Sequence, residues 1–208
     1  LLQLNLPDEK DLEILTPNKN LIGVFDPTKN QDRISKLSSN NINVFSLELL
    51  PRITRAQSMD ILSSQANLAG YKAVVDAFSF FNKAIPMMMT AAGTIPAAKV
   101  LIVGAGVAGL QAIATAKRMG AIVFATDVRM ASKEQVESLG GKFLVVKGSE
   151  NLETSGGYAK ETSPEFKKKQ EELLLETLKK IDIVICTALI PGKNCLLYTS
   201  PSPRDTEV

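Results

Sequence analysis

The sequence contains no histidine and no tryptophan among its 208 residues, and it has only two cysteines. Without histidine, this segment cannot itself supply a Ser-His-Asp triad, a histidine general base or a histidine-bound zinc ion. Cys186 and Cys195 form neither a disulfide framework nor a metal-ligand spacing. We therefore expect no metal site in this segment.

The sequence also lacks a strong excess of either charge. Its formal net charge of +2 predicts no nucleic-acid partner and no attraction to an anionic membrane. Long hydrophobic runs are scarce too, and the longest uncharged stretch, residues 100–116, is shorter than a typical membrane span. A glycine motif interrupts that stretch, so we interpret it as a buried strand followed by a helix.

That motif has the pattern G-x-G-x-x-G and consists of Gly104, Ala105, Gly106, Val107, Ala108 and Gly109. It lies between an apolar run at residues 100–103 and a helical stretch at 110–119, which is the context of a dinucleotide-binding turn. The first glycine permits a tight turn, the second lets the backbone approach a pyrophosphate, and the third lets the helix pack close to the sheet. The N-terminal amides of the helix then face the phosphates.

An acidic residue follows at the distance that such a motif requires. The strand expected at residues 122–126 ends at Asp127, where an acid hydrogen-bonds the adenosine ribose. A carboxylate there repels a 2′-phosphate, so the sequence favours NAD(H) over NADP(H). Arg129, two residues further on, would soften this preference.

The rest of this half predicts a doubly wound parallel sheet. We expect a helix at 133–138, a strand at 143–146, a mobile functional loop at 148–163, a helix at 164–180 and a strand at 181–187. Leu189 follows the carboxyl end of the last strand and therefore belongs to the expected cleft. Residues 97–193 are thus expected to form an NAD(H)-binding Rossmann domain that lacks its last strands.

The first half predicts a second, N-terminally truncated Rossmann-like domain at residues 1–85. Its expected elements are strands at 21–25 and 42–47, a helix that starts around Pro27, and a long helix at 59–81. Residues 86–96, which two prolines bracket, are expected to be a hinge. Residues 194–208 are expected to be a disordered, non-native tail, with a native linker as the alternative.

A cluster of polar residues marks the segment 52–72. Arg52 and Asp60 are suited to hold a carboxamide and a ribose, and the amide of Gln57 offers both donors and an acceptor. So many polar groups beside a half-buried helix indicate a bound ligand. The alternative is a capped helix start with no ligand.

Four runs together resemble the NAD(H)-binding component of proton-translocating NAD(P) transhydrogenase. They are the polar run at 52–71, the glycine motif with ATDVR at 125–129, the GGYAK run at 156–160 and TALIPGK at 187–193. The resemblance covers residues 1–193. It implies that the nicotinamide end of the cofactor meets Arg52, Ile53, Thr54, Gln57, Asp60 and Ser63. It assigns the adenosine to Asp127, Val128 and Arg129, and adds Gly157, Tyr158, Gln170 and Leu189 as contacts.

The resemblance also implies a reaction and its partners. Hydride would pass directly from NADH, bound here, to NADP⁺ on a partner component, coupled to proton translocation through a membrane component. The full-length protein would be a homodimer, peripheral to the cytoplasmic or matrix face of an energy-transducing membrane. Alanine dehydrogenase and a nucleotide-binding module without turnover are the alternatives.

Overall fold

The computed structural model describes residues 1–12, 15–51, 53–146 and 164–188, and these form an α/β fold with parallel sheets. Two compact units divide the chain, Leu1–Gln65 and Ala66–Val208. The division falls within the longest helix, α3 (Ile61–Phe80). Residues 86–96, expected to be a hinge, contain the strands β4 (Met88–Thr90) and β5 (Gly93–Ile95).

The first unit contains a three-stranded parallel sheet in the order β1-β2-β3. Its elements are β1 (Leu2–Gln3), α1 (Glu9–Leu12), β2 (Asn20–Gly23), α2 (Gln31–Ser39), β3 (Asn43–Ser46) and the 3-10 helices η1 (Leu47–Leu49) and η2 (Thr54–Met59). One small core holds this unit together, in which Leu21, Phe25, Leu37 and Ile42 are buried. The sequence correctly predicts both longer strands, with ends shifted by one or two residues.

The start of α2 differs from the sequence prediction. Pro27 is not at the first helical position, because α2 begins at Gln31 and Asp26 has a positive φ of 44°. The Glu48 carboxylate explains the difference, since its Oε1 accepts hydrogen bonds from the backbone N–H groups of Phe25 and Asp26. That contact fixes a turn before the helix, which local sequence alone does not reveal.

The second unit contains a four-stranded parallel sheet in the order β8-β7-β6-β9. Its strands are β6 (Lys99–Val103), β7 (Ile122–Thr126), β8 (Lys142–Phe143) and β9 (Ile183–Cys186). The predicted strand at 122–126 is confirmed at both ends, whereas β8 is shorter than the predicted 143–146. Val100, Leu101 and Ile102 of the central strand β6 are fully buried, as expected for a parallel strand covered on both faces.

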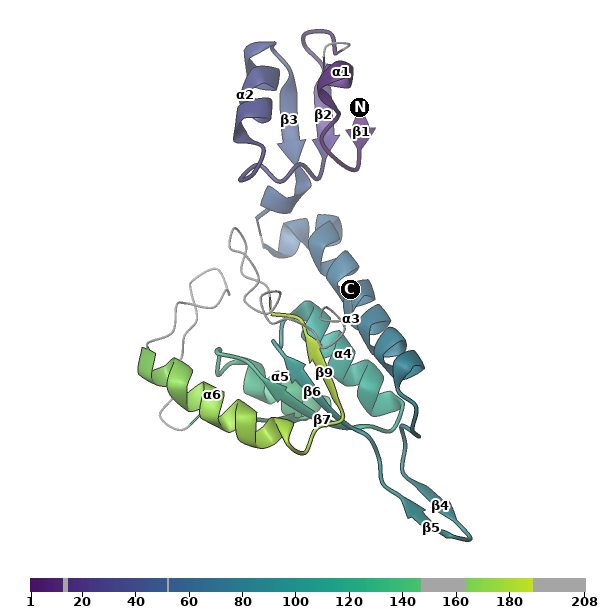
Figure 1. The fold of residues 1–208 in the computed structure, drawn as a ribbon. Coiled ribbons are helices and arrows are strands. Elements are labelled where there is room, and N and C mark those ends of the chain that lie inside the picture. Colours follow the sequence, from purple (N-terminus) through teal and green to yellow (C-terminus); the bar gives the residue numbers. More distant parts are fainter. Residues whose placement is uncertain (13–14, 52, 147–163, 189–208) are drawn as a thin grey trace, which may run out of the picture. The chain divides into compact units, whose positions relative to one another are not determined.

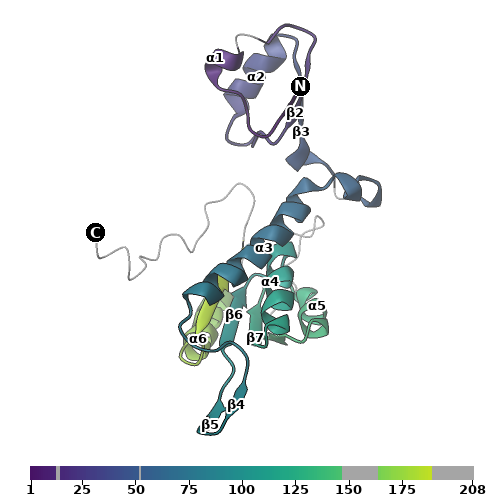
Figure 2. The ribbon, with the colours of Figure 1, turned by 90° about the vertical axis from the view of Figure 1, so that its right-hand side faces the viewer.

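Helices cover both faces of this sheet, as the doubly wound prediction requires. They are α4 (Val107–Arg118), α5 (Ser132–Ser138) and α6 (Pro164–Leu178). The two views place α4 and α5 on one face and α6 on the other (Figures 1 and 2). Val74 and Phe78 of α3 complete the same core as β6 and α4. The carboxyl ends of β6, β7 and β9 therefore lie side by side at one edge.

Strands β4 and β5 form an antiparallel hairpin that the sequence analysis does not predict. Thr90 pairs with Gly93, whose positive φ of 127° suits glycine at the turn. All six strand residues are exposed, and Met89 is 84% exposed. Figure 2 shows this hairpin projecting from the sheet of the second unit.

Candidate functional site

The glycine motif forms the turn between β6 and α4, and two of its glycines are needed for packing. Gly104 has a φ of 94°, and a Cβ there would lie 2.8 Å from the backbone nitrogen of Ala188. A Cβ on Gly109 would lie only 1.9 Å from the carbonyl oxygen of Gly104. Any side chain at these positions would therefore force the turn apart.

Gly106 differs from both neighbours. Its φ of −78° is open to other residues, and the nearest atom to a Cβ at this position would be Arg129 Nη2, at 4.0 Å. The protein itself thus leaves space beside this glycine. The first turn of α4, which begins at Val107, points backbone N–H groups toward the same end of the helix. A pyrophosphate that approaches this backbone needs that space.

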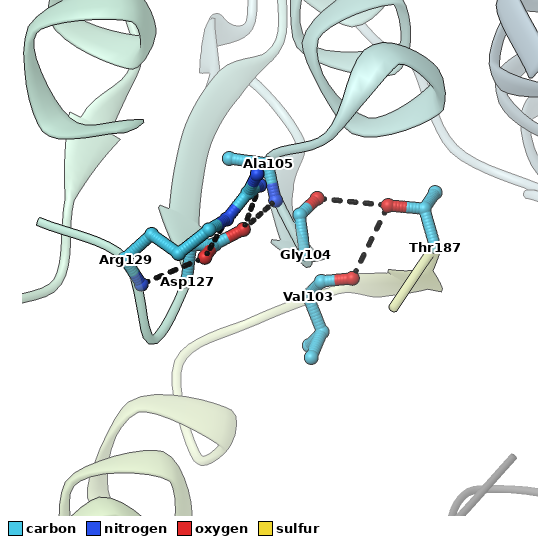
Figure 3. A network of polar contacts seen from close by, with 6 residues as sticks. All are labelled: Val103, Gly104, Ala105, Asp127, Arg129 and Thr187. Atoms are coloured by element: carbon cyan, nitrogen blue, oxygen red, sulfur yellow. Dashed lines mark hydrogen bonds and ion pairs between the residues drawn. The ribbon is translucent and has the colours of Figure 1, made fainter. Parts of the chain in front are cut away.

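Thr187 braces the turn from the end of β9. Its hydroxyl lies 2.8 Å from the carbonyl oxygen of Gly104 and 3.3 Å from that of Val103, and donates to them (Figure 3). The sequence prediction does not include Thr187 among the site residues. The available signal is its position directly after a buried strand that pairs in parallel with β6.

Asp127 lies directly after β7, and its carboxylate holds the turn from the other side. Oδ2 accepts hydrogen bonds from the Ala105 backbone N–H at 2.7 Å and from Arg129 Nη2 at 2.9 Å. Oδ1 accepts from the Arg129 backbone N–H at 2.8 Å and from Arg129 Nε at 2.9 Å (Figure 3). The guanidinium therefore grips the carboxylate with two nitrogen atoms.

This ion pair is well shielded from water, since the side chains of Asp127 and Arg129 are 7% and 20% exposed. Burial by itself raises the pKa of Asp127, but the hydrogen bonds from Arg129 and Ala105 outweigh it. The net result is a lowered pKa, so Asp127 is ionised at neutral pH. Val128, between them, is half-buried.

In the first unit, the residues expected to meet the nicotinamide line one hollow of about 300 Å³. Its lining consists of Leu50, Pro51, Ile53, Thr54, Ala56, Gln57, Asp60 and Ser63. The 3-10 helix η2 presents Thr54 and Gln57, and the start of α3 presents Ser63. The hollow therefore gathers five of the predicted side chains from one short segment.

Asp60 also caps the helix that follows it. Its Oδ1 accepts a hydrogen bond from the Ser63 backbone N–H at 3.0 Å, and its Oδ2 accepts one from the Ser63 hydroxyl at 2.7 Å. An aspartate just before a helix stabilises its first turn in this way. The alternative of a capped helix start is thus correct as a description of Asp60, and it leaves the hollow open to a ligand.

The remaining predicted contacts are not brought together by the described residues. Gln170 is half-buried on α6. Arg52, Gly157, Tyr158 and Leu189 lie outside the described residues, as do the loop at 148–163 and the tail at 194–208. Within the described part of the chain, no group of histidine, cysteine and acidic residues has the arrangement of a metal site.

Comparison with family models adds to this geometry. Residues 1–69 match the model described as "Alanine dehydrogenase/PNT, N-terminal domain", and residues 73–198 match "Alanine dehydrogenase/PNT, C-terminal domain". The chain belongs to the alanine dehydrogenase/PNT family. The resemblance to transhydrogenase is confirmed by relatives and solved structures as well.

One relative is an NAD(P) transhydrogenase alpha subunit of Rhodospirillum rubrum, 63% identical over 166 residues. That match covers 79% of this chain and 43% of the relative, so the chain spans less than half of that protein. The crystal structure of a transhydrogenase from Sinorhizobium meliloti is 51% identical, with a TM-score of 0.77. It covers 92% of this chain and 51% of the other.

An L-alanine dehydrogenase structure shares the fold at 18% identity, with a TM-score of 0.56 over 68% of this chain and 40% of that chain. At this identity the likeness concerns the fold alone. Among the helices that the structure describes, none has the length and apolar character needed to cross a membrane.

Proposed function

We propose that this chain is the NAD(H)-binding part of a proton-translocating NAD(P) transhydrogenase, passing hydride from NADH to NADP⁺ held by a partner component. The observation that carries the proposal is the space beside Gly106, at the end of a parallel strand and facing an ionised Asp127. A Cβ on Gly106 would enter that space, whereas Gly104 and Gly109 are already required by the protein's own packing. The arrangement fits a pyrophosphate with its adenosine ribose.

Residues of both units have roles in the proposal. The turn from Gly104 to Gly109, with Ala105 and Val107, binds the pyrophosphate, and Asp127, Val128 and Arg129 bind the adenosine. Arg52, Ile53, Thr54, Gln57, Asp60 and Ser63 position the nicotinamide. Gly157, Tyr158, Gln170 and Leu189 supply further contacts, as in the family that the chain resembles.

The bound nicotinamide supplies the hydride chemistry, and no substrate proton moves in such a transfer. The chain's own residues therefore have to orient the ring and exclude water, not act as acid or base. The lining of the hollow suits this task, because Asp60 and Ser63 are fixed to each other by two hydrogen bonds. The absence of histidine from the sequence is compatible with this role.

The proposal extends to the assembly. The partners are the NADP(H)-binding and membrane-spanning components, and the full-length protein is a homodimer. Its place is the cytoplasmic or matrix face of an energy-transducing membrane, as a peripheral component. On its own the segment binds NADH but does not complete the transfer.

Two glycine substitutions test nucleotide binding. Gly106→Ala is expected to leave the fold intact and to weaken NADH binding by about tenfold or more, because the added methyl occupies the space that a phosphate needs. Gly109→Ala is the matched control: it is expected to lower the free energy of unfolding, since its Cβ would lie 1.9 Å from the Gly104 carbonyl oxygen.

Fluorescence titration with NADH and urea unfolding measure the two effects. A folded Gly106→Ala variant with unchanged NADH affinity would remove the pyrophosphate assignment.

A further inference from the structure

Asp127 has no vacant acceptor position in this structure. An ionised carboxylate offers about four lone-pair positions on its two oxygens. Two donors occupy each oxygen of Asp127, and three of the four belong to Arg129. A ribose hydroxyl that donates to Asp127 must therefore replace a donor that is already in place.

The side chain of Arg129 is the donor that can leave. The N–H groups of Ala105 and Arg129 belong to the backbone of two tight turns, so their loss would need the turns to open. The guanidinium is carried on a flexible stem and the side chain remains 20% exposed. It also borders the space beside Gly106, with Nη2 4.0 Å from a Cβ position there.

We propose that Arg129 is a resident competitor of the nucleotide: its guanidinium occupies the ribose-binding positions of Asp127 and is displaced when the ribose binds. The inference rests on the proposed function, because it assumes that Asp127 receives a ribose hydroxyl. The freed guanidinium then lies next to the pyrophosphate side of the turn, where a cation stabilises the phosphates.

Displacement also has a consequence for nucleotide choice. A 2′-hydroxyl carries a proton and replaces an N–H donor on Asp127. A 2′-phosphate at neutral pH presents acceptor oxygens, so it leaves the carboxylate without the lost hydrogen bonds and adds repulsion. Selection of NADH over NADPH thus follows from which ligand can take the place of Arg129.

Adenosine is the sharpest probe, because it has the ribose hydroxyls but no phosphate for Arg129 to attract. Arg129→Met removes the competitor and keeps a long, flexible side chain. We expect this variant to bind adenosine roughly tenfold more tightly than the wild type, in line with the usual strength of hydrogen bonds to a charged group. Binding of 2′,3′-dideoxyadenosine, which lacks both hydroxyls, is expected not to improve.

Arg118→Met is the matched control, since it removes the same charge from an exposed position in the last turn of α4. It is expected to bind adenosine as the wild type does. If Arg129→Met does not fold because Asp127 is left unpaired, Arg129→Lys replaces it. An ammonium group cannot repeat the two-nitrogen grip, so adenosine binding is still expected to strengthen.

The wild type gives an independent readout by NMR. The Nε–H of Arg129, held 2.9 Å from Oδ1, is expected to change its chemical shift and exchange faster with water when adenosine is added. An unchanged Nε–H signal at saturating adenosine, or unchanged affinity in both folded variants, would overturn the proposal. If the wild type binds neither NADH nor adenosine, the proposed function itself fails and this inference fails with it.

Discussion

At the residue scale, the cap at the start of α3 limits what the hollow can offer a ligand. The Ser63 hydroxyl proton is directed to Asp60 Oδ2, so both side chains present acceptor positions to the hollow. Gln57 brings an amide with two N–H donors to the same hollow. A carboxamide has one acceptor oxygen and one donor NH₂ group, and the lining matches both.

Gln57→Asn withdraws this amide by one methylene group. We expect hydride transfer in the reconstituted complex to slow by about tenfold or more, because the reacting geometry tolerates little displacement. NADH binding should change less, since the pyrophosphate and adenosine contacts remain. Single-turnover transfer and NADH titration measure the two effects.

Gln135→Asn, at an exposed position of α5, is the control and should alter neither quantity. Equal losses of binding and transfer in Gln57→Asn would mean that Gln57 contributes only uniform binding.

At the element scale, the close crossing of α3 and α4 supports the glycine turn. A Cβ on Gly70 would lie 2.1 Å from the carbonyl oxygen of Ala108, in the first turn of α4. Gly70 is buried, and Val74, one turn later, is part of the same core. The position of the turn thus depends on a residue far from it in the sequence.

Gly70→Ala is expected to lower the free energy of unfolding by about 1–3 kcal/mol, the usual cost of overpacking a core. In open space the same change would favour a helix by roughly 1 kcal/mol, so a net loss reports the clash. Urea unfolding measures it, with Gly106→Ala as the variant that has room for its methyl group. Unchanged or increased stability would show that α3 and α4 separate without cost.

The sequence predicts best where local pattern and tertiary packing agree. Strands β6 and β7 are apolar runs that end at Gly104 and Asp127, and the structure has them at nearly the predicted bounds. Pro27 was misleading because Glu48, distant in sequence, fixes the preceding turn. The β4–β5 hairpin has no alternation of polar and apolar residues, so periodicity could not find it.

The candidate site was predictable to a similar degree. The glycine motif and Asp127 follow from spacing, and both lie at the same turn in the structure. The grip of Arg129 on Asp127 depends on a side-chain conformation, and the contact of Thr187 depends on the pairing of β9 with β6. Neither leaves a local sequence signal.

At the scale of the whole molecule, the two units have cores of very different size. Four buried residues form the core of the first unit, whereas fourteen form that of the second. Because stability grows with buried apolar area, we expect the first unit to open more readily.

Hydrogen exchange measured by mass spectrometry tests this expectation and the proposed nucleotide site together. Backbone amides of β2 and β3 are expected to exchange faster than those of β6 and β7. NADH at about a hundredfold its dissociation constant should add up to about 2.7 kcal/mol of protection in β6, β7 and α4. Equal protection before and after NADH would contradict the assignment of the adenosine and pyrophosphate to this unit.

The strand order of the second sheet also has a consequence for the birth of the protein. Val100 pairs with Val123 on one side and with Ile183 on the other, so one edge of β6 waits for a segment made much later. During synthesis the ribosome releases β6, α4 and β7 early, and they can associate while the β9 partner is still missing. The fully buried strand of this sheet then has an open edge, which is a hazard for aggregation. Chaperone binding to the nascent chain is expected to concentrate in this interval and to end when β9 emerges.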